Sequence, residues 1–188
     1  MKKRTSFVNT EFKTREEGSQ KIIEGYFIVF NQPTELWRGF YEEVSPEAIG
    51  DLDDVKVLWN HNQDIVLAWT RNQTAELKKD SHGVWASVIV NEKDSDAMNA
   101  YERINRGDVA GCSFGFELVR EEYTNKDNGE TLATIRELNL FEVSPCVFPA
   151  YPQTTISARK KDYQEEQTRS KKARASNLLK KIGGSNGS

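Results

Sequence analysis

Short apolar runs, each bounded by turn-forming residues, fill the chain from Lys21 to Val143. They are rich in Ile, Val, Phe, Tyr and Trp, which pack well on a pleated sheet, while Gly, Pro, Asn and Asp stand between them. The predicted strands are Ile22–Phe30, Phe40–Val44, Val55–Trp59, Ile65–Thr70, Ala75–Lys79, Val84–Val90, Cys112–Tyr123 and Thr131–Val143. So many short strands restrict the chain to a β-rich fold.

Helical signals are few. Asp94–Arg106 repeats apolar residues at helical spacing and is followed by Gly107, a common C-cap residue. Ser45-Pro46-Glu47 has the residues of a helix start, and residues 162–181 have the composition of a weaker helix. Many strands with few helices predict an α+β fold, built as a β-rich barrel or a strongly bent sheet with a few flanking helices.

The length of 188 residues suits one domain with short extensions. Residues 1–20 are polar and lack a clear period, so we predict an N-terminal arm. Residues 21–158 are predicted to form the domain. Residues 159–188 are predicted to form a basic tail, either helical or disordered. Pro145, which follows the last predicted strand, is expected to end regular strand pairing.

The charge is unevenly distributed. The net charge is −3, but residues 159–188 hold nine basic and three acidic residues, for a net +6. The remaining 17 basic and 26 acidic residues give the body a net charge of −9, which argues against a specific nucleic-acid partner. The basic tail is suited to an acidic partner, or is simply a solvated extension.

Composition excludes further classes. No run approaches the roughly 20 apolar residues of a membrane-spanning helix, so no membrane partner is expected. The basic opening is not followed by an apolar stretch, so we expect no signal peptide and synthesis that ends in the cytoplasm. The two cysteines and two histidines do not stand at metal-ligand spacing, so neither a metal nor a cofactor is expected.

His61 lies between two predicted strands, in Leu58-Trp59-Asn60-His61-Asn62. A histidine at a strand end can reach a cleft, and an ordinary pKa of about 6.5 suits proton transfer. The alternative is a turn histidine bonded to backbone. His82, within a predicted hairpin turn, is expected to be solvent-exposed.

Ser113 opens a predicted strand in Gly111-Cys112-Ser113-Phe114-Gly115-Phe116. Its small neighbours leave room for a substrate backbone, and glycine N–H groups are suited to an oxyanion. The alternative is a serine in a tight helix-to-strand turn, since a nucleophile elbow has the order strand then helix. Cys112 is the rival nucleophile, but strand alternation prevents both side chains from facing one cleft.

Glu142 lies near a strand end between apolar neighbours, where a carboxylate needs a partner such as an imidazole N–H. The alternative is an edge-strand glutamate that points to water. Asp64, three residues from His61, is the rival partner. The residues therefore suggest His61 as base, Ser113 as nucleophile and Glu142 as the acid that orients the base.

At these residues the chain resembles the tailed-phage prohead (capsid maturation) serine protease family. The likeness covers about residues 22–158. The segments that carry it are Gly25–Pro33, Leu58–Asn62, Arg106–Phe116 and Leu140–Pro152. The last two segments, Arg106–Phe116 and Leu140–Pro152, are specific for this family when both occur in one chain. His61 and Ser113 match the family's pattern directly, and Glu142 matches it in the last segment.

The resemblance implies a serine endopeptidase with a fold similar to that of herpesvirus assemblin proteases. Such proteins are packed inside immature capsids in the host cytoplasm. They cleave a scaffold or the N-terminal segment of the major capsid protein, and typically themselves. Those capsid or scaffold segments are the expected partners, and homo-oligomerisation is left open.

The chain departs from the family at two places. Asn62 stands where an acidic residue is usual, and Leu67-Ala68-Trp69-Thr70 replaces a Leu-Gly-Arg-Thr-like string. This removes an arginine near the expected site, for which Arg71 is a weak substitute. Two other function classes stay open: a non-catalytic capsid-assembly or scaffold module on the same fold, and a thiol hydrolase that uses Cys112.

Overall fold

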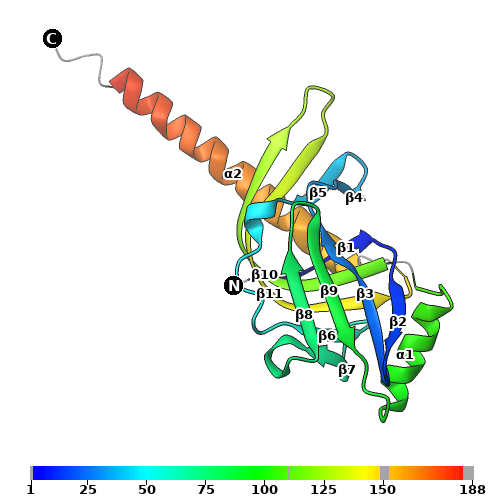
Figure 1. Cartoon of the computed structure of the whole chain (residues 1–188). Coiled ribbons are helices and arrows are strands. Elements are labelled where there is room, and N and C mark those ends of the chain that lie inside the picture. Colours follow the sequence, from blue (N-terminus) through cyan, green and yellow to red (C-terminus); the bar gives the residue numbers. More distant parts are fainter. Residues whose placement is uncertain (1, 110, 149–152, 184–188) are drawn as a thin grey trace. The chain divides into compact units, whose positions relative to one another are not determined.

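A computed structural model describes residues 2–109, 111–148 and 153–183 (Figure 1). Its helices are α1 (Ser95–Asn105) and α2 (Gln153–Gly183), with the short 3₁₀ turns η1 (Pro46–Ala48) and η2 (Thr70–Asn72). Its strands are β1 (Lys2–Asn9), β2 (Lys13–Glu17), β3 (Gln20–Val29), β4 (Thr34–Trp37), β5 (Phe40–Val44), β6 (Lys56–Trp59), β7 (Asn62–Trp69), β8 (Ala75–Lys79), β9 (Gly83–Ile89), β10 (Gly111–Asn125) and β11 (Thr131–Cys146).

The larger sheet is organised around β11. Its strand order is β1-β10-β11-β5-β4, and the hairpin of β6 and β7 joins it through a β6–β11 pairing. The strand β11 pairs antiparallel with β10 on one side. On its other side it pairs in parallel first with β5 and then, at Glu142 and Val143, with β6. One long strand thus brings the β6–β7 turn beside Glu142.

The smaller sheet has the order β2-β3-β9-β8 and is antiparallel throughout. One apolar cluster joins both sheets and α1. It includes Phe27 and Ile28 of β3, Val84 and Val88 of β9, Phe114 and Phe116 of β10, Val143 of β11, and Ala97 and Tyr101 of α1. These side chains are almost completely buried, so the two sheets and α1 share one hydrophobic core.

The α+β prediction is confirmed, but within the described residues the sheets do not close into a barrel. Of the two arrangements predicted, the closed barrel is therefore wrong. Short alternating strands are compatible with both, because their sequence does not show which distant strands pair at the sheet ends. The expected likeness to herpesvirus proteases stays a prediction.

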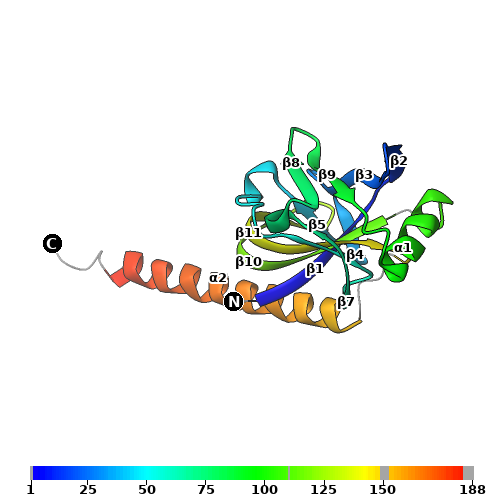
Figure 2. The same cartoon turned by 60° about the horizontal axis from the view of Figure 1, so that its bottom comes forward.

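The first 20 residues do not form the predicted arm. They contain β1, which pairs with β10, and β2, which pairs with β3 (Figures 1 and 2). Polar side chains conceal this pairing in the sequence, because their charges are satisfied by residues far along the chain. Arg4 Nη1 lies 2.9 Å from Glu121 Oε1, and the Ser6 hydroxyl donates to Glu42 Oε1 at 3.0 Å.

The strand β11 extends past the predicted end at Val143. Pro145 lies within it, opposite Cys112, and the strand ends at Cys146. Proline lacks an N–H but its carbonyl can still pair, and Pro145 O accepts a hydrogen bond from Asn60 N at 3.1 Å. This extension, which the prediction of a break at Pro145 missed, places Ser144 in the sheet.

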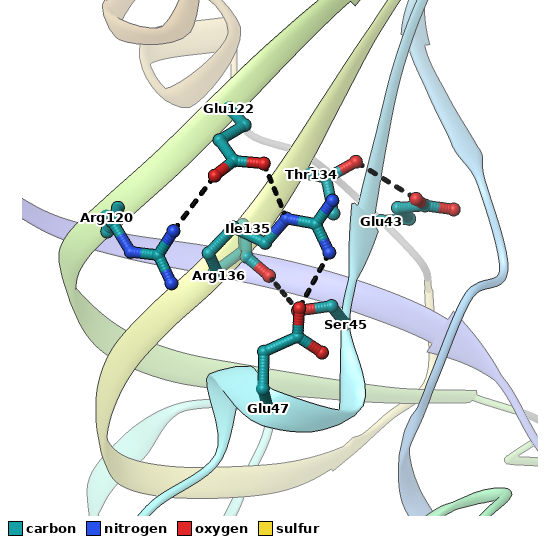
Figure 3. Close-up of polar contacts among 8 residues, drawn as sticks. All are labelled: Glu43, Ser45, Glu47, Arg120, Glu122, Thr134, Ile135 and Arg136. Atoms are coloured by element: carbon teal, nitrogen blue, oxygen red, sulfur yellow. Dashed lines mark hydrogen bonds and ion pairs between the residues drawn. The ribbon is translucent and has the colours of Figure 1, made fainter.

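The predicted helix at Asp94–Arg106 is confirmed as α1, with the Asp94 carboxylate accepting from Asp96 N and Ala97 N as an N-cap. The start predicted at Ser45 yields only η1, because the Ser45 hydroxyl donates to Ile135 O instead of capping. Arg136 then connects Glu47 of η1 to Glu122 of β10, at 2.7 and 2.8 Å (Figure 3). These contacts hold the turn after β5 against the β10–β11 pair.

The chain divides into two compact units, Met1–Tyr151 and Pro152–Ser188. The second unit contains α2, a helix longer than the one expected at residues 162–181. Neither α1 nor α2, as far as the structure describes them, is long and apolar enough to cross a membrane.

Candidate active site

The β6–β7 turn positions His61. Trp59 and Asn62 are paired across the hairpin, and both residues between them have positive φ, 50° at Asn60 and 61° at His61. These values are typical of a type I′ hairpin turn, which asparagine tolerates well but histidine adopts rarely. The end of β11 and the residue that follows it hold the turn in place: His61 N donates to Ser144 Oγ at 3.2 Å, and Asn60 Oδ1 accepts from Val147 N at 3.0 Å.

The structure brings His61 and Glu142 together. His61 Nδ1 lies 2.6 Å from Glu142 Oε1, and Glu142 is only 6% exposed. The second carboxylate oxygen, Oε2, accepts from the Ser144 hydroxyl at 2.7 Å. The partner of Glu142 is therefore the imidazole, as predicted from the apolar neighbours of Glu142, and not solvent.

The surroundings of His61 favour its protonated form. Burial of the ring lowers its pKa, but hydrogen bonds and charge interactions with Cys146 and Glu142 outweigh burial and raise the pKa of His61 to about 10. A carboxylate in direct contact stabilises an imidazolium, which is the charge that a base acquires when it accepts a proton.

Two residues that support this pair were not identified from the sequence. Ser144 is fully buried and bonds both to the backbone of His61 and to the carboxylate of Glu142. Gly115 lies opposite Glu142, and a methyl group there would overlap both Glu142 Oε1 and the Phe141 ring. Strand alternation was the available signal, since Ser144, two residues after Glu142, faces the same side.

Ser113 lies on β10 directly opposite Ser144 and is 7% exposed. Its side chain shares a sheet face with Ser144, because directly opposite residues of an antiparallel pair point the same way. Its hydroxyl donates to the carbonyl oxygen of Ser6, on β1, at 2.8 Å. Among the described residues, no hydrogen bond joins Ser113 to His61. The structure thus joins two of the three candidates and engages the third elsewhere.

The rival residues are poorly placed. Cys112 is fully buried in the core cluster, and burial raises the pKa of its thiol well above the usual value. Asp64 is exposed, and its backbone N–H bonds to Asn62 Oδ1 in its own turn. His82 is exposed, as expected, with its ring 4.4 Å from that of Tyr26. A thiolate mechanism through Cys112 is therefore disfavoured.

The segment that departs from the family lies away from His61. Trp69 is paired with Lys56 at the end of the β6–β7 hairpin opposite the His61 turn. Its indole N–H donates to Asp54 at 2.7 Å, and Arg71 Nη1 lies 4.0 Å from the same carboxyl group. Position 69, where the family usually has an arginine, and Arg71 therefore both lie at the end of the hairpin away from the His61 turn.

Comparison with known proteins defines the class. The family model of caudovirus prohead serine proteases matches residues 9–169, so the chain belongs to this family. The chain is therefore a serine protease of the capsid-maturation class, and the resemblance seen in the sequence is confirmed. The prohead protease of Enterobacteria phage HK97 is 29% identical over 161 residues, which cover 84% of this chain and 68% of that protein. No solved structure matches the chain.

Proposed function

We propose that this protease uses Ser113 as nucleophile, His61 as general base and Glu142 as the acid that orients His61. The observation that carries the proposal is the contact of His61 Nδ1 with the buried Glu142 carboxylate, one strand away from Ser113. In the neutral ring, a carboxylate at Nδ1 selects the tautomer whose Nε2 has a free lone pair. That nitrogen is the atom that would take the Ser113 proton.

The reaction follows from these roles. His61 Nε2 removes the hydroxyl proton as Ser113 Oγ attacks the carbonyl carbon of a peptide bond, and Glu142 stabilises the resulting imidazolium. The imidazolium then protonates the leaving amine as the C–N bond breaks, which leaves an acyl-enzyme. Water, deprotonated by His61, attacks the ester and releases the acid, and the Ser113 hydroxyl is restored.

The substrates in this proposal are a scaffold or the N-terminal segment of the major capsid protein, cut inside the procapsid, together with the protease itself. Membership of the prohead protease family supports this choice. The basic tail, net +6 against a body of net −9, is a candidate for docking to an acidic capsid interior or for removal by self-cleavage.

Co-expression with the neighbouring major capsid gene, followed by mass spectrometry of every product, tests the proposal. We expect Ser113→Ala to abolish cleavage of both proteins, a loss of at least about a thousandfold, because the variant lacks the proposed nucleophile. Cys112→Ala should retain most of the cleavage, since its thiol faces the core. Normal cleavage by Ser113→Ala would rule out the serine mechanism at this position.

A further inference from the structure

The strand β1 covers the edge of β10 that carries Ser113. Residues Lys2–Asn9 pair antiparallel with Leu118–Gly111 without a register shift (Figure 2). In the strand order of the larger sheet β1 is the terminal strand, so β10 lies between β1 and the strand that carries Glu142. A segment of the protein's own chain therefore lies, in extended form, along the proposed nucleophile.

The contact at Ser113 involves a peptide carbonyl. Phe7 is the register partner of Ser113, and the Ser113 hydroxyl donates to the carbonyl of the Ser6–Phe7 peptide bond. A peptide bond in an extended strand is thus held against the attacking group. The geometry is unproductive, because the hydroxyl proton points to the carbonyl oxygen instead of to His61.

The side chain that follows this carbonyl occupies a recess. Phe7 is 8% exposed, and a methyl group at Gly111 would overlap its ring. Gly111 and Ser113 face the same side of β10, being two residues apart. The missing side chain at Gly111 therefore makes room for an aromatic ring beside the nucleophile.

From these contacts we propose that the β10 edge from Gly111 to Leu118 is the binding site for an extended peptide substrate. In this structure β1 occupies the site as an occluding strand. The recess over Gly111 accepts an aromatic residue directly after the scissile bond. Strand addition to a sheet edge supplies main-chain hydrogen bonds, and the recess supplies selectivity. The inference rests on the proposed role of Ser113 and adds how substrate reaches it.

The occluding strand is tethered, so substrate competes with an intramolecular ligand at high effective concentration. It is also anchored by the buried ion pair of Arg4 with Glu121, whose side chains are 5% and 6% exposed. Apparent affinity for substrate falls by the fraction of molecules in which the site is open. Locking β1 in place should therefore block the site, and releasing it should restore access.

A reversible cross-link between β1 and β10 tests whether β1 occludes a peptide-binding site. Lys3 and Glu117 are register partners remote from Ser113, and directly opposite residues have Cα separations that suit a disulfide. In the full chain with Ser113→Ala, Lys3→Cys and Glu117→Cys, we would measure the binding of a fluorescent peptide with the sequence of Lys2–Asn9. We expect binding after reduction and at least about tenfold weaker binding when cross-linked. The same peptide with alanine for Phe7 should bind at least about tenfold more weakly than the parent.

Each single cysteine variant is a matched control for the substitutions, and intact mass verifies the cross-link. Equal peptide binding in the oxidised and reduced states, or no binding in either, would overturn the inference. With Ser113 restored, cross-linking should slow cleavage of the capsid protein and reductant should recover it. Redox-dependent peptide binding without any proteolysis would support the strand site while contradicting the proposed function.

Discussion

The contacts on the two sides of β10 near Ser113 differ: side chains interact on the β11 side, and a main-chain carbonyl is bound on the β1 side. Toward β11, the partly exposed His61 and the buried Glu142 and Ser144 form a network in which both carboxylate oxygens and the His61 backbone are bonded. Toward β1, the Ser113 hydroxyl is bonded to a main-chain carbonyl of a strand near one end of the chain. In the proposed mechanism the side that orients the base is preassembled, whereas the side of the nucleophile is occupied by β1, which we propose that substrate replaces.

Different parts of the fold orient His61 and cover Ser113. The network that we propose to act in every turnover is built from side chains on one strand and an anchored turn, so its geometry is set by the sheet. In the proposal, access to Ser113 depends on β1, which pairs with β10, whereas the His61 turn is held by Ser144 of β11. Separate substitutions should therefore affect the two sides separately.

After the loss expected for Ser113→Ala, the largest effect should come from changing Glu142, the acid that we propose orients His61. Glu142→Gln keeps the shape but removes the charge next to His61, and kcat should fall by about a thousandfold or more. The loss should be visible in cleavage of the capsid protein under saturating substrate. A Glu142→Gln enzyme with wild-type kcat would show that Glu142 does not orient the base.

The activity of the Glu142→Gln variant as a function of pH should shift in a defined direction. The base must be unprotonated, so activity should rise with pH through the raised pKa of His61, above the ordinary value of about 6.5. Removing the Glu142 charge destabilises the imidazolium and should move this limb to lower pH. The raised pKa also contributes stability below pH about 6.5 that is lost as pH rises through about 10, which thermal unfolding across that range would detect.

A smaller effect is expected at Ser144. Ser144→Ala removes the hydroxyl that joins the His61 backbone to Glu142, so kcat should fall roughly ten- to hundredfold while KM changes little. Ser87→Ala, on β9 of the other sheet, is the matched control and should keep wild-type kcat. An equal rise in KM with unchanged kcat would place Ser144 in substrate binding instead of positioning.

The smallest effect should come from loosening the occluded side. Phe7→Ala removes the ring over Gly111, weakens the hold of β1 and should speed cleavage of added capsid protein by several-fold, up to about tenfold. Phe12→Ala is the control, because Phe12 packs against Phe27 in the smaller sheet, with ring centroids 5.2 Å apart. If both variants changed activity alike, the gain would reflect general loosening and not release of β1.

Much of the site could be predicted from local chemistry. A half-buried glutamate needs a partner and a turn histidine can supply one, so the pairing of Glu142 with His61 was predicted and is present. The separation of Cys112 from Ser113 followed from strand alternation alone, and the core position of Cys112 agrees with it.

The residues missed are those whose role depends on a strand partner. Gly115 and Ser144 matter because of what lies opposite or beside them, and that depends on the register of β10 with β11. The pairing of the first 20 residues is hidden in the sequence for the same reason, since the buried contacts of Arg4 and Ser6 are with Glu121 and Glu42, far along the chain.

The amino-acid sequence by itself determined the β-rich α+β class, the helix at Asp94–Arg106 and the three candidate residues, because these follow from local periodicity, capping and side-chain chemistry. Only the tertiary structure decided that the sheets stay open over the described residues, that the β6–β7 turn docks on β11, and that β1 lies over Ser113. Those outcomes depend on long-range pairing and register, in which a backbone hydrogen bond is available to almost any residue and so leaves little trace in the sequence.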